Sequence, residues 1–318
     1  MSVTPSSRPE VLLLSPMPEW DLEPMRAAYR LVDPPADGRM QALANVRALV
    51  ASGGQRVDAA LIEALPALEL IAVYGVGYDK VDLDAARRRN IAVSNTPDVL
   101  TADVADLALA LTLALARRIV VGDAFVRSGA WETSTLPLAT GGVSGRKVGI
   151  VGLGRIGEAI ARRFAGFDTE IGYWNRSPKP AAPWRAFPTL EALAAWADIL
   201  VVTVAGGNGT AGLIDAAVLA ALGKDGLFVN ISRGSTVDEA ALIAALESGA
   251  IGGAGLDVFM GEPKIDRRFA GFDNVVLSPH QGSATLGSRQ AMGALVRANL
   301  AAHFAGDKLP SAVLERRR

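Results

Sequence analysis

The 318-residue sequence contains no cysteine, which excludes disulfides, thiolate nucleophiles, iron–sulfur clusters and cysteine-ligated zinc. It contains only two histidines, His280 and His303, so a site built from several histidine ligands is excluded as well. We therefore expect no metal centre.

Neither sign of charge dominates, since 32 basic residues stand against 33 acidic ones and the net charge is −1. Such a chain has no field to steer it toward nucleic acid or an anionic membrane, and we expect neither as a partner. Long apolar runs are also missing. The run Leu107–Ala116 is half a membrane span, and Val11–Leu14 is too short for a signal peptide. We expect a cytoplasmic protein.

Half of the residues are apolar, and short β-branched runs alternate with stretches rich in alanine and leucine, as in parallel α/β sheets. The runs form two series, which predict two Rossmann-like or flavodoxin-like parallel-sheet domains. The first series of predicted strands is Val11–Leu14, Ala48–Ala51, Leu70–Val73 and Ile91–Val93, with helices at Ala59–Leu65 and Asp82–Arg89. The second is Lys147–Val151, Thr169–Trp174, Ile199–Val204, Leu227–Ile231, Ala254–Leu256 and Val275–Leu277.

The turn-rich cluster Asn95–Asp98 predicts a domain boundary. After it, Thr101 or Asp103 opens a predicted helix Val104–Val121, which is apolar on every side and therefore expected to be buried. A final helix over Leu286–Phe304 returns to the first domain. We predict one domain from residues 1–97 and 286–318, a second from 98–285, and an active-site cleft between them.

The strongest motif follows the predicted strand Lys147–Val151 and opens a helix. In a dinucleotide fingerprint the first glycine makes a tight turn, the second lets the backbone approach a pyrophosphate, and the third packs helix on strand. The helix N-terminus then faces the phosphates. The expected cofactor-binding residues of this motif are Gly152, Leu153, Gly154, Arg155, Ile156 and Gly157.

The end of the next predicted strand, Asn175-Arg176-Ser177, bears on the choice of cofactor. NAD enzymes place a carboxylate near this position to bind the ribose 2′-hydroxyl, whereas an arginine can bind a 2′-phosphate. NADP(H) is therefore expected to be preferred, with NAD(H) possible. A solvated loop with an incidental arginine is the alternative.

A second glycine loop, Gly75-Val76-Gly77, follows the predicted strand Leu70–Val73 but lacks a third glycine. It either turns backbone N–H groups toward a small anion or makes a tight turn only. The residues leave both alternatives open.

Arg233, Glu262 and His280 lie just beyond predicted strands of the second domain, where ligand crevices of α/β proteins form. With the fingerprint and Gly75-Val76-Gly77, their order and separation resemble the D-isomer-specific 2-hydroxyacid dehydrogenases over essentially the whole chain. Three further segments resemble the NADP-using hydroxypyruvate and hydroxyphenylpyruvate reductases, namely Val126–Trp131, Ser144–Ile150 and Asn175–Ser177. The loop Ala205–Thr210 departs from the leucine- and proline-containing loop usual there.

The chemistry of a 2-keto acid reductase suits these three side chains. An imidazole exchanges a proton near neutral pH, so His280 is the expected acid, and Glu262 would orient it and favour its charged form. Arg233 would fork onto the substrate carboxylate and polarise the carbonyl. The domain 98–285 would be the NAD(P)-binding Rossmann domain, and residues 1–97 with 286–318 the flavodoxin-like substrate-binding domain.

The resemblance implies further contacts. Val76 and Gly77 N–H groups would hold the substrate carboxylate, Asp257 would meet the nicotinamide carboxamide, and Ile231 would meet its ring or ribose. Arg233, His280 and Gly282 are also expected beside the cofactor, and the region of the helix Val104–Val121 implies a homodimer.

We therefore expect NADPH-dependent reduction of glyoxylate, hydroxypyruvate or a similar small 2-keto acid to the D-2-hydroxy acid. The alternatives are an NAD-dependent D-2-hydroxyacid dehydrogenase acting on a larger or phosphorylated substrate, and a dinucleotide-sensing corepressor, which shares this fold.

Overall fold

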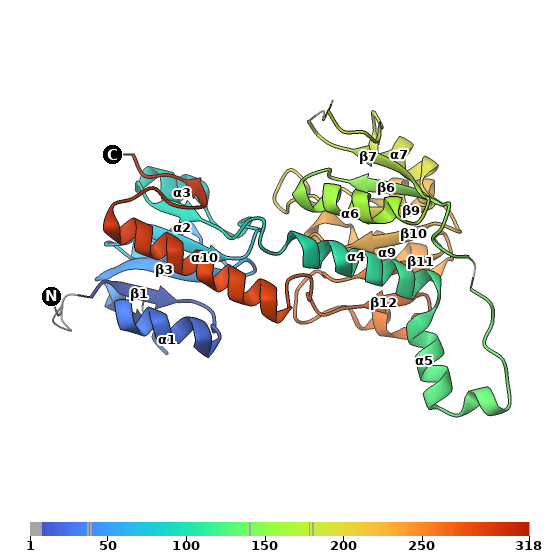
Figure 1. Cartoon of the computed structure of the whole chain (residues 1–318), viewed down its shortest axis with the longest axis horizontal. Coiled ribbons are helices and arrows are strands. Elements are labelled where there is room, and N and C mark those ends of the chain that lie inside the picture. The colour runs from blue at the N-terminus through green and yellow to red at the C-terminus, as the bar shows by residue number, and fades with distance from the viewer. Residues whose placement is uncertain are drawn as a thin grey trace. The chain divides into compact units, whose positions relative to one another are not determined.

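A computed structural model describes residues 8–36, 38, 40–139, 141–177, 179 and 181–317. The chain divides into two compact units, one of residues 1–100 and 285–318 and one of residues 101–284. Each unit is built on its own sheet (Figure 1). The α/β class with two largely parallel sheets is confirmed. The functional roles predicted for the two domains, and a cleft between them, stay predictions.

The sheet of the first unit has six strands in the order β13-β5-β4-β3-β1-β2. All neighbours pair in parallel except β13, which runs antiparallel to β5. Leaving β13 aside, this is the flavodoxin-like order. The strands are β1 (Glu10–Leu13), β2 (Arg30–Val32), β3 (Val46–Ser52), β4 (Leu70–Tyr74), β5 (Ala92–Ser94) and β13 (Ala312–Leu314).

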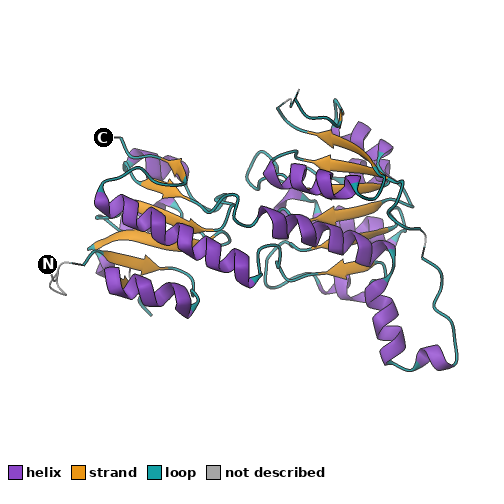
Figure 2. Ribbon diagram, viewed as in Figure 1, coloured by secondary structure: helices purple, strands orange, loops and turns teal. Residues whose placement is uncertain are grey.

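Helices cover the sheet of this unit (Figure 2), and side-chain caps start several of them. Asp58 accepts from the Leu61 N–H, Asp82 from Ala85 and Thr285 from Ser288, which satisfies donors that a helix start leaves unpaired. The helices are α1 (Glu19–Ala28), α2 (Ala59–Ala64), α3 (Leu83–Arg88), α10 (Leu286–Ala305) and the 3₁₀ helix η2 (Met40–Leu43).

The sheet of the second unit has seven parallel strands in the order β12-β11-β10-β9-β6-β7-β8. From β6 the chain proceeds first to β7 and β8 on one side, then to β9 and onward on the other. This is the Rossmann order, with its switch point beside β6. The strands are β6 (Lys147–Val151), β7 (Glu170–Trp174), β8 (Arg185–Ala186), β9 (Ile199–Val202), β10 (Leu227–Asn230), β11 (Gly253–Leu256) and β12 (Val275–Leu277).

Helices pack on both faces of this second sheet, with α4 and α6 together on one and α7, α8 and α9 on the other (Figure 1). Small residues in β11 let α4 lie close, because a Cβ at Gly255 would be 3.2 Å from the Leu111 Cβ. The helices are α4 (Thr101–Ala116), α5 (Ile119–Arg127), α6 (Arg155–Ala165), α7 (Leu190–Trp196), α8 (Ala216–Leu222), α9 (Glu239–Glu247) and the 3₁₀ helices η3 (Ala130–Glu132), η4 (Gly234–Thr236) and η5 (Arg267–Gly271).

The predicted single helix Val104–Val121 is wrong. The chain forms α4 and α5 instead, because Arg118 adopts a left-handed backbone conformation (φ 52°) that ends α4. Burial on every side is also wrong, since Leu107, Leu109 and Leu113 are only partly buried. The apolar pattern runs through the break because α5 begins with another apolar run, Ile119-Val-Val121.

Other predicted elements differ only at their ends. The predicted strand Ile199–Val204 ends at Val202, and Ile91–Val93 lies one residue later, at Ala92–Ser94. Among the helices in the described part of the chain, none is both long and apolar enough to cross a membrane.

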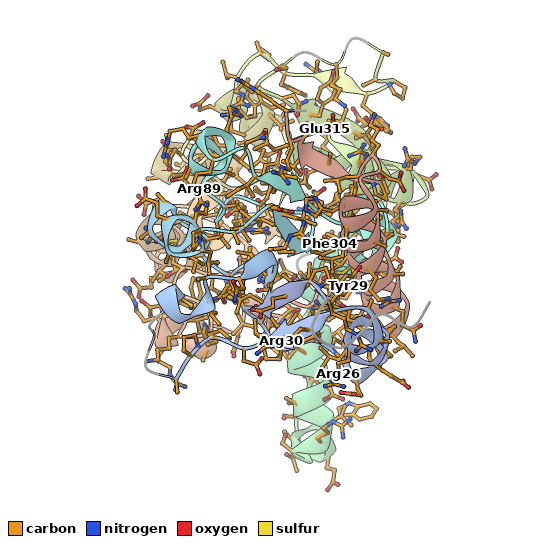
Figure 3. The ribbon with its side chains drawn as sticks, turned by 90° about the vertical axis from the view of Figure 1, so that its left-hand side faces the viewer. Arg26, Tyr29, Arg30, Arg89, Phe304 and Glu315 are labelled. Atoms are coloured by element: carbon orange, nitrogen blue, oxygen red, sulfur yellow. The ribbon has the colours of Figure 1, made fainter. Side chains whose placement is uncertain are left out.

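Helices α1 and α10 pack side by side in the first unit. The rings of Tyr29 and Phe304 have centroids 5.4 Å apart (Figure 3). Asp21 of α1 is fully buried and forms an ion pair with Arg297 of α10. Gly293 lies on α10 directly against the Asp21 carboxylate, where an added Cβ would overlap it. The absence of a side chain at 293 therefore allows the charged pair between the helices.

Gly293→Ala should destabilise the protein by about 1–3 kcal/mol, because the methyl group would overlap the buried Asp21 carboxylate and displace it from its ion pair with Arg297. Gly287→Ala, on the same helix, is the matched control, since no atom lies within 4 Å of its added Cβ. Urea unfolding curves of both variants check this. Equal stability of the two would show that the close approach at Gly293 has no energetic consequence.

Candidate active site

The predicted dinucleotide fingerprint forms a tight loop between β6 and α6. Gly152 has φ 100°, and an added Cβ would lie 2.9 Å from the Val204 backbone nitrogen. A Cβ at Gly157 would overlap the Gly152 carbonyl oxygen, whereas one at Gly154 would meet no atom within 4 Å. Gly152 and Gly157 thus permit close packing, while Gly154 faces open space. No side chain caps α6 at Gly154, so this helix start suits a bound phosphate.

Asn175, directly after β7, holds this loop in place. Its Oδ1 accepts a hydrogen bond of 2.7 Å from the Leu153 N–H. The sequence suggested a contact with the adenosine ribose, and the structure adds this role in shaping the phosphate loop. Such a role was not foreseen because it depends on the side-chain rotamer.

Arg176 and Ser177 are exposed beyond the end of β7. The Arg176 guanidinium lies against the loop of residues 205–210, since a Cβ at Gly209 would be 3.2 Å from its Nη1. This is the loop that departs from the family's usual sequence. Because Gly209 has no side chain, the Arg176 guanidinium can lie against this loop, close to the fingerprint loop Gly152–Gly157.

His280 and Glu262 form a direct pair. The His280 Nδ1 lies 2.7 Å from Glu262 Oε2, and Glu262 Oε1 accepts from the Phe259 N–H at 2.7 Å. Burial raises the pKa of Glu262. The hydrogen bonds from His280 and Phe259 and the nearby charges of His280 and Arg233 outweigh burial, so its pKa lies below the usual value of 4.5. The glutamate is therefore ionised at neutral pH and its charge faces the imidazole.

Asp257, at the end of β11, anchors the segment that carries His280. Its buried carboxylate accepts from the Ser278 hydroxyl (2.6 Å), the Gln281 N–H (2.6 Å) and the Gly282 N–H (2.9 Å). Its backbone carbonyl accepts from the His280 N–H at 2.9 Å. Burial raises the pKa of Asp257, and these hydrogen bonds and the charge of His280 oppose the rise.

The anchored segment holds His280 in a left-handed conformation (φ 55°), which non-glycine residues seldom adopt. Gly282 is fixed by the same carboxylate. A nicotinamide contact for Asp257 stays a prediction, now beside this anchoring role.

Arg233 follows β10, on the loop that leads into η4. Its carbonyl oxygen accepts from Asn230 Nδ2 (3.0 Å) and Thr236 Oγ1 (2.6 Å), which fixes the backbone that presents the side chain. Gly234 packs directly against the Phe259–Met260 backbone, and any Cβ there would overlap it. This close approach brings Arg233 to the segment that carries Glu262, and the arginine's charge helps to lower the pKa of Glu262.

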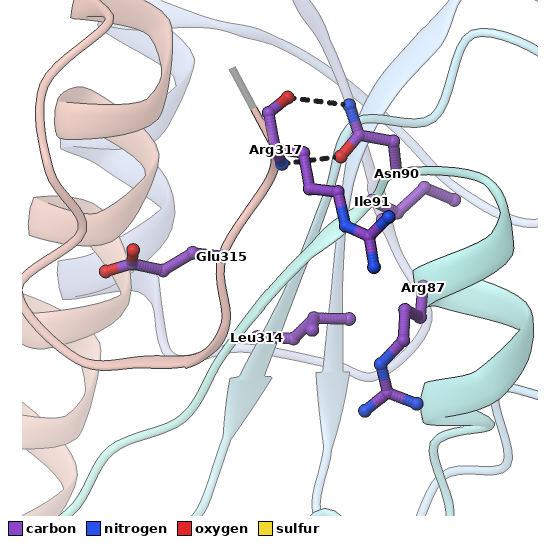
Figure 4. A pocket seen from close by; sticks show the side chains of 6 residues that line it. All are labelled: Arg87, Asn90, Ile91, Leu314, Glu315 and Arg317. Carbon is purple, nitrogen blue, oxygen red and sulfur yellow. Dashed lines mark hydrogen bonds between the residues drawn. The ribbon is translucent and has the colours of Figure 1, made fainter.

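The three predicted catalytic side chains thus lie together at the carboxyl ends of β10, β11 and β12, with Ile231 nearly buried at the end of β10. Val76 and Gly77 belong to the other unit, directly after β4, and their role stays a prediction. The pocket drawn in Figure 4 lies between α3 and the C-terminal segment, defined as residues 306–317. It contains none of the predicted site residues.

Sequence reasoning missed supporting residues. Glu239, which opens α9, accepts from the Met260 N–H at 2.9 Å and so helps to hold the Glu262 segment. Ser278 and Asn230 were likewise given no role by the sequence. Their position at strand ends was the one available indication.

Residues 109–282 match the family described as D-isomer specific 2-hydroxyacid dehydrogenase, NAD binding domain. The chain is 44% identical to a 2-ketogluconate reductase of Gluconobacter oxydans over 97% of this chain and 100% of that protein. It is 47% identical to glyoxylate/hydroxypyruvate reductase A of Arabidopsis thaliana over 85% of this chain and 86% of that protein.

Among solved structures, the fold is similar to the NADPH-dependent glyoxylate/hydroxypyruvate reductase of Sinorhizobium meliloti, determined in complex with NADP and malonate. The TM-score is 0.93 at 40% sequence identity, covering 98% of this chain and 99% of that chain.

Proposed function

The chain belongs to the D-isomer-specific 2-hydroxyacid dehydrogenases and is an NAD(P)-dependent 2-keto acid reductase, and we propose that it reduces small 2-keto acids such as glyoxylate or hydroxypyruvate with NADPH. The product is the D-2-hydroxy acid. The observation that carries this proposal is the His280–Glu262 pair beside Arg233. The pair lies on the same edge of the sheet as the fingerprint loop Gly152–Gly157.

The reaction adds a hydride to C2 of the keto acid and a proton to its carbonyl oxygen. NADPH, when bound, would supply the hydride and be oxidised to NADP⁺. His280 supplies the proton from its imidazolium form, through the ring nitrogen that does not face Glu262. The ionised glutamate holds the ring in place and stabilises the charged donor before the transfer.

Arg233 binds the substrate. Its planar guanidinium matches a carboxylate in two hydrogen bonds and also polarises the neighbouring carbonyl, a task for which a lysine is less suited. The backbone N–H groups of Val76 and Gly77 donate hydrogen bonds to the same carboxylate. The substrate carbonyl group is thereby held so that the hydride reaches its carbon and the proton from His280 reaches its oxygen.

The cofactor would be held by the residues whose geometry fits it. The open face at Gly154 and the uncapped start of α6, with Arg155 and Ile156, suit the pyrophosphate. Arg176 and Ser177 suit a 2′-phosphate, because both are exposed beside the end of β7. Ile231, Asp257 and Gly282 are the proposed neighbours of the nicotinamide. NAD(H) lacks the 2′-phosphate, and we propose it as the poorer of two possible cofactors. A cytoplasmic location stays a prediction.

We further propose a homodimer formed through the α5 arm, defined as residues 119–138. None of the residues of α5 is buried, and the arm extends from the sheet of its own unit (Figure 1). Its exposed fractions include 54% at Ile119, 55% at Val126, 67% at Trp131 and 94% at Leu138. So many exposed apolar side chains on one segment are typical of a surface that a second chain covers.

His280→Ala should lower kcat with glyoxylate or hydroxypyruvate about 10²–10⁴-fold, because the proton donor is lost, while NADPH affinity is unchanged. Glu262→Gln should lower kcat less, because the imidazole is kept and only the carboxylate that holds its Nδ1 is lost. His303→Ala, at the only other histidine, is the control. Half of wild-type kcat in His280→Ala would refute the assignment.

Arg176→Ala should raise the KM for NADPH roughly 10–100-fold, the loss expected for a charge-assisted hydrogen bond of about 1.5–3 kcal/mol. NADH kinetics should stay nearly unchanged. Arg185→Ala removes a neighbouring arginine that stacks on Phe187 and should affect neither cofactor. All assays need one ionic strength, since salt screens the contact. An equal loss with both cofactors would contradict the NADPH preference.

Light scattering coupled to size exclusion should give twice the chain mass of 33.1 kDa for the wild type. The double variant Ile119→Asp, Val126→Asp should elute as a monomer, because two charges would be buried without partners. Trp20→Asp, at an exposed aromatic of α1, should remain dimeric. A monomeric wild type at micromolar concentration would disprove the proposal.

A further inference from the structure

Two buried asparagines and the half-buried Ser311 connect the C-terminal segment to Asn95, the residue that follows β5. The Ser311 hydroxyl donates to the Asn95 carbonyl oxygen at 2.6 Å. Asn299 of α10 holds that serine twice, because its Nδ2 donates to Ser311 Oγ at 2.8 Å and its Oδ1 accepts from the Ser311 N–H at 3.2 Å. All three residues lie in the first unit.

Asn95 and Thr96 in turn hold the glycine loop after β4. Asn95 Nδ2 donates to the Val76 carbonyl oxygen at 2.8 Å, and the Thr96 N–H donates to the Gly75 carbonyl oxygen at 2.9 Å. Two successive carbonyl groups of the loop are thus fixed. In the described part of the chain, neither the Val76 N–H nor the Gly77 N–H donates a hydrogen bond, so both remain available to an anion.

Burial makes these hydrogen bonds costly to break. Asn299 is fully buried and Asn95 is 9% exposed. A buried amide that loses its partner cannot turn to water, so each member fixes its neighbour. The loop conformation therefore depends on Asn95 and, through it, on Ser311.

We propose that Asn95 is a positioning residue for substrate binding, and that Ser311 of the C-terminal segment supports it. Asn95 fixes the Val76 carbonyl so that the adjacent N–H groups of Val76 and Gly77 converge on the substrate carboxylate. This inference rests on the proposed function, in which Val76 and Gly77 share that carboxylate.

The chain offers a matched control at Asn90, another asparagine that holds the C-terminal segment. Its Nδ2 donates to the Arg317 carbonyl oxygen at 3.1 Å, and its Oδ1 accepts from the Arg317 N–H at 2.7 Å (Figure 4). Asn90 thus makes two hydrogen bonds to the same segment and, among the described residues, none to the loop Gly75–Gly77.

Asn95→Ala should raise the KM for glyoxylate about 3–10-fold, the effect of losing one buried hydrogen bond, and leave the KM for NADPH unchanged. Ser311→Ala should act in the same direction with a smaller effect. Asn90→Ala should change neither KM. A residue with only a structural role would lower the melting temperature without this separation between the two substrates.

Amide hydrogen exchange gives a readout that needs no activity. Exchange of the Thr96 amide, which donates to the Gly75 carbonyl oxygen, should be faster in Asn95→Ala than in wild type and unchanged in Asn90→Ala. Unchanged exchange in Asn95→Ala would overturn the positioning role, and faster exchange with an unchanged KM for glyoxylate would overturn the link to substrate. Should Asn95→Ala fail to fold, Asn95→Asp and Ser311→Ala carry the same two readouts.

The two proposals fail in different ways. If wild type reduces no 2-keto acid, the proposed function fails and the carboxylate role of the loop fails with it. The exchange rates then still decide whether Asn95 positions the loop.

Discussion

The buried carboxylate of Asp257 is the group on which the geometry of the active site depends. It is 1% exposed and would be costly to bury without hydrogen bonds, so the segment 278–282 must supply them. That segment includes His280, whose left-handed backbone is held by the same contacts. Since β11 and β12 are neighbours in the parallel sheet, the anchor and the histidine reach the same edge. The position of His280, the proposed proton donor, is thus determined by a residue that need not exchange protons.

The same device recurs at other strand ends. Asn175 accepts from Leu153 in the loop Gly152–Gly157, Asn230 donates to the Arg233 carbonyl, and Asn95 donates to Val76. In each case a short side chain at a strand end fixes the backbone of a nearby loop. Asparagine and aspartate suit this task because they are rigid and present their polar atoms close to the main chain. The three loops that we propose to hold ligands are each fixed in this way.

The sequence predicted the long strands and the site residues, but not the short strands or the hydrogen-bond partners of the side chains in the site. Buried strands such as Lys147–Val151 stand out as β-branched runs, but β2 and β8 are two or three residues long and each contains an arginine. The strand β13 is apolar but only three residues long, and it was not predicted. The helix α1 was missed because it contains Pro24 and many charges. The break at Arg118 is a backbone conformation, which residue periodicity cannot reveal. The glycine roles follow from residue type alone, whereas the partners of Asn175 and Asp257 depend on rotamers and tertiary packing.

The most direct test of this account is turnover by the wild-type protein. NADPH oxidation should be followed with glyoxylate, hydroxypyruvate, hydroxyphenylpyruvate and 2-ketogluconate, and again with NADH, and the chirality of the product from hydroxypyruvate determined. The account predicts oxidation with a small 2-keto acid, a higher kcat/KM with NADPH than with NADH, and the D-2-hydroxy acid as product. No oxidation of either cofactor with any of these acids, or an L-product, would contradict it.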